Sequence, residues 1–168
     1  MSGSGLSLRP VTAADRELLF TWANDPETRM RSFASDPISW PEHCAWFEAR
    51  MRDTDELFWM ILSAAGEPVG QLRVTPEADG MGVVSVSIAP AWRGRGLAAE
   101  GLALATRSAL ASGRFTGLRA YVRPDNEASL RAFARAGYRG ARPVHHRGHD
   151  TQLLCFPPEA ADESEPGG

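Results

Sequence analysis

Lysine is absent from this chain of 168 residues, and all 18 of its basic residues are arginine. The chain therefore cannot use a P-loop lysine, a Schiff-base lysine or a lysine that carries pyridoxal phosphate. The two cysteines, Cys44 and Cys155, are too few for a disulfide framework or a paired-cysteine metal site, so we expect two free thiols in a reducing cytosol. The longest uncharged stretch, residues 80–92, is too short to span a bilayer, and residues 1–5 do not begin a signal peptide. These absences predict a cytoplasmic protein without membrane contact.

The composition indicates one globular domain. Hydrophobic residues make up 43% of the chain and charged residues 23%, which is ordinary for a soluble domain of this length. We expect residues 1–156 to form that single domain. Residues 157–168 are acidic and rich in proline and glycine, which predicts a disordered tail.

Charge is unevenly distributed along the chain. Residues 1–90 hold 7 arginines and 13 acidic residues, whereas residues 91–156 hold 11 arginines and 4 acidic residues. A basic half within an acidic protein favours a polyanionic ligand on that half. Since the chain is acidic overall and has no nucleic-acid-binding motif, we expect a phosphorylated small molecule and no nucleic acid.

The hydrophobic pattern predicts an alternation of strands and helices. Strands are expected at 6–11, 57–64, 69–75, 83–89, 117–122, 138–144 and 151–156. Helices are expected at 12–24, 39–52, 97–112 and 127–136, with capping residues Thr12 and Ser39, and a short helix or turn is expected at 27–33. This order favours an α/β fold of the α+β kind, with one mixed sheet and helices on both of its faces.

The most informative segment joins the expected strand at 83–89 to the expected helix at 97–112. Gly94 and Gly96 allow the connecting backbone to turn so that successive N–H groups point at one place. The first turn of the helix adds its unpaired N–H groups, and Arg93 and Arg95 add side-chain charge. The segment therefore predicts a pyrophosphate-binding turn.

The spacing Arg93-x-x-Gly96-x-Ala98 resembles a signature of the GNAT superfamily of acyl-CoA-dependent N-acyltransferases. The later run Asn126-x-x-Ser129-x-x-x-Phe133-x-x-x-Gly137-Tyr138 resembles a second signature of that family. The resemblance covers residues 6–156. It implies a mostly antiparallel, seven-stranded sheet in which the central strands 83–89 and 117–122 splay apart.

The resemblance also implies a reaction and its co-substrate, acetyl-CoA, with no metal. The pantetheine arm would lie between the splayed strands, and the N–H of Ile88 would polarise the thioester carbonyl while a neutral amine attacks directly. Main-chain amides of residues 93–98 would hold the pyrophosphate, and Asn126 would bond the cofactor arm. The residues implied to contact the cofactor are Ile88, Ala89, Arg93, Gly94, Arg95, Gly96, Leu97, Ala98, Asn126, Ser129 and Phe133.

Two positions depart from the family pattern. Phe133 stands where many members have a tyrosine that protonates the leaving thiolate, and Tyr121 and Tyr138 do not occupy that place. Ser85 and Ser87 stand on the strand where some members have a glutamate base. A base must then lie elsewhere or act through water, which favours a weakly basic amine as the acceptor.

Residues 22–47 resemble the GNAT subgroup that acetylates a nucleotide-linked 4-amino sugar in pseudaminic acid biosynthesis. That resemblance predicts diphosphate binding by Arg29 and Arg31, ring stacking on Trp46, and His43 as a water-relayed base. Each of these side chains also has a purely structural interpretation. The complete set of predicted acceptor-side and catalytic residues is Arg29, Arg31, Phe33, Trp46, Ser85, His43 and Ile88.

Other functions stay open at this point. The acceptor could instead be a protein N-terminus or an aminoglycoside, and the chain could be a catalytically silent acyl-CoA-binding protein, as Phe133 suggests. His145, His146 and His149 favour a solvated hairpin tip over a metal site. The partner expected overall is a small-molecule amine, with the protein a monomer or homodimer.

Overall fold

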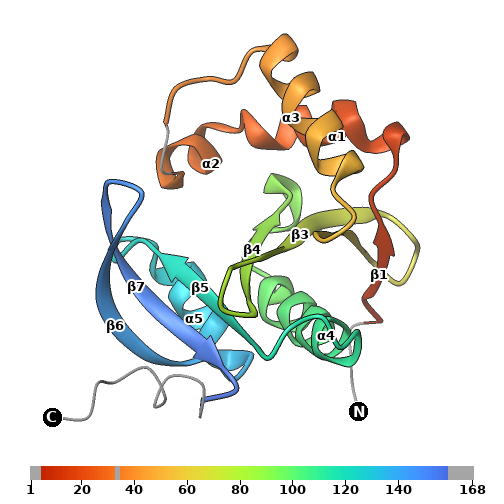
Figure 1. Ribbon diagram of the computed structural model, residues 1–168. Coiled ribbons are helices and arrows are strands. Elements are labelled where there is room, and N and C mark those ends of the chain that lie inside the picture. The colour runs from red at the N-terminus through yellow and green to blue at the C-terminus, as the bar shows by residue number, and fades with distance from the viewer. Residues whose placement is uncertain (1–4, 33–34, 159–168) are drawn as a thin grey trace, which may run out of the picture.

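Seven strands form one sheet in the computed structural model, which describes residues 5–32 and 35–158 (Figure 1). Their order across the sheet is β1-β2-β3-β4-β5-β7-β6. Within the described residues, every neighbouring pair is antiparallel except β4 and β5. The strands are β1 (Ser7–Pro10), β2 (Leu57–Leu62), β3 (Pro68–Pro76), β4 (Met81–Ile88), β5 (Gly117–Val122), β6 (Arg139–His146) and β7 (His149–Phe156).

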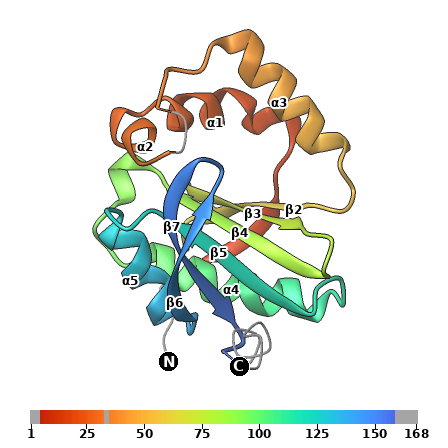
Figure 2. The same ribbon diagram turned by 60° about the vertical axis from the view of Figure 1, so that its left-hand side comes forward.

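Helices cover both faces of this sheet (Figures 1 and 2). The α-helices are α1 (Arg16–Ala23), α2 (Pro26–Arg31), α3 (Trp40–Arg52), α4 (Leu97–Ala111) and α5 (Glu127–Arg135). The 3-10 turns are η1 (Ala13–Asp15) and η2 (Pro90–Trp92). Side-chain caps begin several of them: Ser39 Oγ accepts from Glu42 N at 3.3 Å, and Thr12 N donates to Asp15 Oδ2 at 2.8 Å.

Strand β2 shows how the two layers form. Its alternate residues belong to two different hydrophobic clusters, because successive side chains of a strand point to opposite faces. Ile61 packs with α4 and α5, whereas Phe58 and Met60 pack with α1 and α3. Met60 and Ile61 are fully buried. The sheet thus has a core on each side, as a continuous apolar strand such as Leu57–Leu62 requires.

The sheet divides at its centre, between β4 and β5. These two strands pair only through Met81, Gly82 and Val83 of β4 among the described residues, and beyond that point they separate (Figure 1). Gly82 sits at the point of contact, where a Cβ atom would lie 2.6 Å from Val74 and 2.9 Å from Phe115. A residue without a side chain therefore allows the two strands and the residues beneath them to approach closely.

The predicted fold class is confirmed: the sheet has seven strands, is mostly antiparallel, and has its central pair splayed. The helix predicted at 12–24 is instead η1 followed by α1, which ends at Ala23 because Pro26 starts a new helix capped by Asp25. The tail predicted from residue 157 lies outside the described residues from 159 onward. No helix in the described part of the chain has the length and apolarity that a membrane span needs.

Candidate active site

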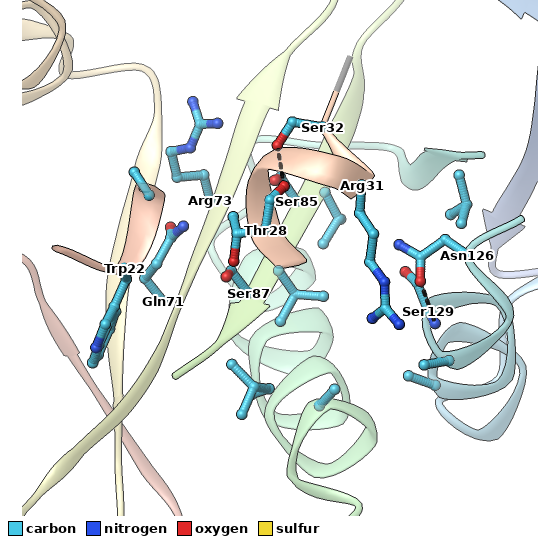
Figure 3. A pocket seen from close by; sticks show the side chains of 18 of the residues that line it. Trp22, Thr28, Arg31, Ser32, Gln71, Arg73, Ser85, Ser87, Asn126 and Ser129 are labelled. Carbon is cyan, nitrogen blue, oxygen red and sulfur yellow. Dashed lines mark hydrogen bonds between the residues drawn. The ribbon is translucent and has the colours of Figure 1, made fainter. Parts of the chain in front are cut away.

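A cleft of about 1220 Å³ opens where β4 and β5 separate. Its walls come from the backbone of β4, the turn before α4, the first turn of α5, helices α1–α3 and the β6–β7 hairpin. Figure 3 shows Ser85 and Ser87 on β4 at the centre of this cleft, with α2 in front and Asn126 and Ser129 at the start of α5. The cleft therefore brings together the segments that the sequence motifs singled out.

The backbone of β4 presents hydrogen-bonding groups to this cleft. Ala89 N donates to Val69 O at 2.8 Å, and Ile88 lies opposite Gly70 in the antiparallel ladder with β3. In such a ladder the N–H and C=O groups of successive residues point alternately toward and away from the partner strand. The main-chain groups of Ile88 and Val86 therefore point away from β3, into the gap that β5 has left.

The turn that follows β4 has the geometry of an anion-binding site. Gly94 and Gly96 both have left-handed φ angles, +79° and +75°, which L side chains rarely adopt. Gly96 is the N-cap of α4, so the helix begins at Leu97 with its unpaired N–H groups facing the cleft. The connection from β4 to α4 therefore supplies backbone N–H donors and the positive end of a helix dipole at one place.

The side chain of Arg93 has a different role from the one predicted. Its guanidinium bonds to Asp25 Oδ2 at 2.9 Å, Glu27 Oε2 at 2.7 Å and Thr28 Oγ1 at 2.8 Å. These contacts tie the turn to α2, so the charge of Arg93 is already balanced by two carboxylates. Arg95 lies over the ring of Trp92, with 4.8 Å between its guanidinium carbon and the ring centroid, and its guanidinium is exposed.

The first turn of α5 forms the opposite wall of the cleft. Asn126 Oδ1 caps that helix by accepting from Ser129 N at 3.3 Å, which leaves its amide nitrogen as the donor. Phe133 lines the cleft and packs edge-on against Tyr138, with ring centroids 5.0 Å apart. Tyr138 is fully buried and bonded to Thr106, and burial raises its pKa to about 12. Neither ring therefore offers an acid to the cleft.

The predicted diphosphate ligand Arg29 is used inside the protein. Its Nε donates to Ala23 O at 2.6 Å, and its other nitrogens donate to Ser32 Oγ and Asp36 O. These bonds join α1, α2 and the loop before α3, and burial lowers the pKa of the guanidinium. Arg29 thus stabilises the wall and does not reach across it.

Arg31 does enter the cleft. In Figure 3 its side chain extends from α2 toward Asn126 and Ser129 at the start of α5, rather than over the face of β4. It also forms an ion pair with Glu27 at 2.9 Å. Phe33, the other residue predicted on this segment, lies outside the described residues.

His43, predicted to relay a proton, packs among aromatic rings at the wall of the cleft. It is 2% exposed, and its Nε2 lies 2.8 Å from Arg16 O, so this nitrogen donates to a carbonyl. Its ring lies among the rings of Phe20, Trp40, Trp46 and Phe47. His43 also lines the cleft, and because Nε2 donates to the carbonyl, Nδ1 is the nitrogen that would act as a base; the relay of a proton by His43 stays a prediction.

Trp46 is half-buried and its ring already has neighbours. It contacts His43 at a centroid distance of 5.8 Å and Phe58 edge-on at 5.9 Å. The guanidinium of Arg73 lies over it at 5.1 Å. The ring therefore supports Arg73, and the predicted stacking on a substrate ring would have to displace that contact.

The sequence analysis missed a polar face on β3 and β4. Gln71 and Arg73 of β3 lie opposite Ser87 and Ser85 of β4, and Figure 3 shows all four side chains on the same face of the two strands. The signal was present as alternation: Gln71 and Arg73 interrupt an apolar strand at every second residue, as Ser85 and Ser87 do. Of these four, only Ser85 was predicted.

The tip of the β6–β7 hairpin lines the cleft; the sequence predicted the hairpin but not this position. The ring of His146 stacks on that of Tyr121 of β5, with centroids 3.7 Å apart and an interplanar angle of 3°. His146 is thus packed rather than solvated, and burial lowers its pKa. The next residue, Arg147, is exposed and lines the cleft.

Comparison with known families agrees with this geometry. Residues 6–139 match the model of the acetyltransferase (GNAT) domain. The chain is a GNAT acetyltransferase. Its co-substrate is accordingly acetyl-CoA. No curated protein sequence matches it.

Solved structures with the same fold share little sequence with this acetyltransferase. AAC(6')-Ib in complex with paromomycin and acetyl-CoA superposes with a TM-score of 0.81 at 13% identity, over 98% of this chain and 99% of that one. Spermidine N-acetyltransferase from Vibrio cholerae, with CoA and spermine, gives a TM-score of 0.78 at 16% identity, over 92% and 96% of the two chains. Both establish the fold. In the described part of the acetyltransferase, no three histidine, cysteine or acidic side chains are grouped to hold a metal ion.

The structural role of His43 leads to a prediction. Replacing it with alanine should lower the free energy of unfolding by about 2–4 kcal/mol, because a buried ring and its hydrogen bond are lost. The pH profile of kcat/KM should keep its shape in the folded variant. Urea titration and steady-state kinetics measure the two effects. Glu48→Ala, on an exposed position of the same helix, is the control, and loss of a limb of the pH profile in His43→Ala would restore His43 as a base.

Proposed function

We propose that this acetyltransferase transfers the acetyl group of acetyl-CoA directly to the amine of a small molecule. One observation carries the proposal. The unpaired main-chain groups of Val86 and Ile88 line the same cleft as the Gly94–Gly96 turn and the start of α4. That arrangement offers a strand edge for an extended amide-containing arm and a set of N–H donors for a pyrophosphate at its end.

The residues present suit acetyl-CoA. The pantetheine arm has amide groups that match a strand edge, and the gap between β4 and β5 is open beyond Val83. Arg93, Gly94, Gly96, Leu97 and Ala98 of this turn line the same cleft and would hold the pyrophosphate through main-chain N–H groups, whereas the exposed Arg95 lies over Trp92 and is not among the residues described as lining the cleft. Asn126 would donate its amide N–H to the arm from the opposite wall.

Acetyl-CoA supplies an acetyl thioester, and this chain's residues would prepare it for attack. The N–H of Ile88 points into the gap and would stabilise the carbonyl oxygen as it gains negative charge. With Phe133 at the tyrosine position, the leaving thiolate must take its proton from water or from the attacking amine. The reaction would need no covalent enzyme intermediate.

The positive charges of the cleft, rather than a dedicated base, would promote deprotonation of the acceptor amine. The described residues lining the cleft include nine arginines and three glutamates, and of these arginines Arg93 is balanced by Asp25 and Glu27 while Arg29 is bonded within the wall. Positive charge nearby disfavours an ammonium group and lowers the pKa of the amine, so a larger fraction is neutral at pH 7. An amine that already has a moderate pKa fits such a site better than lysine.

The favoured acceptor is a nucleotide-linked amino sugar, and the basic lining supports it. The structural neighbours are complexes with paromomycin, kanamycin and spermine, which are polycations. A polycation would meet mostly guanidinium groups in this cleft, at a cost in Coulomb energy. A nucleotide-linked sugar places phosphate charge beside those groups.

A thiol-release assay with acetyl-CoA tests the function. Three acceptors separate the classes: a UDP-linked 4-amino sugar, kanamycin, and a peptide that begins with alanine. We expect turnover with the amino sugar and at most weak turnover with kanamycin. Calorimetric CoA binding without thiol release from any acceptor would instead indicate a silent acyl-CoA-binding protein, and absence of CoA binding would refute the proposal.

The turn itself can be tested with two matched glycines. Gly94 and Gly113 have nearly the same left-handed φ, +79° and +74°, and an added Cβ would meet no atom within 4 Å at either place. Gly94→Ala and Gly113→Ala should therefore cost similar stability, roughly 1 kcal/mol. Calorimetry should show weaker CoA binding for Gly94→Ala alone. Equal CoA affinities in the two variants would contradict the assignment of the turn.

A further inference from the structure

Arg73 and Arg147 bring positive charge to the acceptor end of the cleft from two different elements. Arg73 lies on the polar face of β3 beside Ser85, and Arg147 lies at the tip of the β6–β7 hairpin. Both line the cleft, and both are remote in sequence from the pyrophosphate turn. Neither was among the residues that the sequence motifs indicated.

The protein neutralises the positive charge at this end of the cleft only in part. Buried Glu56 lies 3.1 Å from Arg50 and 3.6 Å from Arg73, so one carboxylate serves two guanidinium groups. In the described part of the chain no carboxylate forms an ion pair with Arg147. Glu77, which also lines the cleft, is paired with Arg119 at 2.8 Å. Burial lowers the pKa of Arg73, Glu56 raises it, and Arg50 and Arg147 lower it further, as expected where positive charge exceeds negative.

The backbone of Arg147 adopts a strained, left-handed conformation at the tip of the hairpin. Its φ is +51°, and the following Gly148 has φ +80°, so the two form a tight left-handed hairpin turn between paired His146 and His149. Asparagine or glycine fits the first position of such a turn better than arginine. The stack of His146 on Tyr121 anchors this tip beside the cleft. An arginine kept at a position where its backbone is strained favours a functional role for its side chain.

We propose that Arg73 and Arg147 form a phosphate-binding subsite that recognises the acceptor amine through its phosphate group. This inference rests on the proposed acetyltransferase function and identifies the class of acceptor as a phosphorylated amine. Two guanidinium groups from separate walls suit a phosphate, which offers several oxygens, better than a single carboxylate. Ser85, between Arg73 and the gap, lies where the rest of the acceptor would pass toward Ile88.

The test compares glucosamine 6-phosphate with glucosamine, which differ only in the phosphate. Calorimetric titrations use full-length protein saturated with CoA, so that the pyrophosphate turn is already filled. Saturation with CoA is itself the check on the proposed function, and its failure would be seen before either sugar is added. We expect the phosphorylated sugar to bind at least about tenfold more tightly, and the difference to shrink at high salt.

The variants assign that preference to the two arginines. Arg147→Gly removes the charge while relieving the backbone strain, so it should fold at least as well as the parent and lose most of the preference for the phosphorylated sugar. Arg73→Gln should also lose most of this preference under conditions in which the variant is folded. Arg107→Gln removes one arginine from the exposed face of α4, outside the cleft, and should keep the preference. Equal or undetectable binding of the two sugars, or a preference that survives Arg147→Gly, would overturn the subsite.

Discussion

The separation of β4 from β5 is the constraint on which the rest of the structure depends. The two strands pair through three residues of β4 and then part, so the edge of β4 keeps main-chain donors and acceptors that a closed sheet would have used. Gly82 lies within this short paired segment, where an added Cβ would come within 3.0 Å of Val74, Phe115 and Leu118. Everything that lines the cleft, from the α4 junction to the β6–β7 hairpin, is arranged around that opening.

A second feature links the turn before α4 to helix α2. Arg93 belongs to the turn proposed to hold pyrophosphate, yet its guanidinium bonds to three side chains of α2. The same helix carries Arg31 over the cleft. Because one guanidinium joins these parts, the geometry of the turn and the position of the acceptor wall depend on each other. The notably basic lining complements this arrangement, since it favours both a phosphorylated ligand and a neutral amine.

The elements of the fold could be predicted where short sequence patterns determine them. Alternation, capping residues and the glycines at 94 and 96 predicted the strands, the helices and the turn, because those signals act over a few residues. The roles of individual side chains depend on contacts between residues distant in sequence, so they could not be predicted in this way. Arg29 and His43 do line the cleft, but the sequence could not show that tertiary packing also bonds them to the backbone carbonyls of Ala23 and Arg16. Arg147 carried no motif at all, and only the hairpin's placement beside the cleft reveals it.

The most direct test of the central claim is amide hydrogen exchange on β4, followed residue by residue with NMR. If acetyl-CoA lies along the open edge of this strand, its addition should slow exchange at Val86 and Ile88 by about tenfold or more. Ser85 and Ser87, whose amides already face β3, should change far less. Unchanged exchange at Val86 and Ile88 in protein saturated with acetyl-CoA would contradict the account.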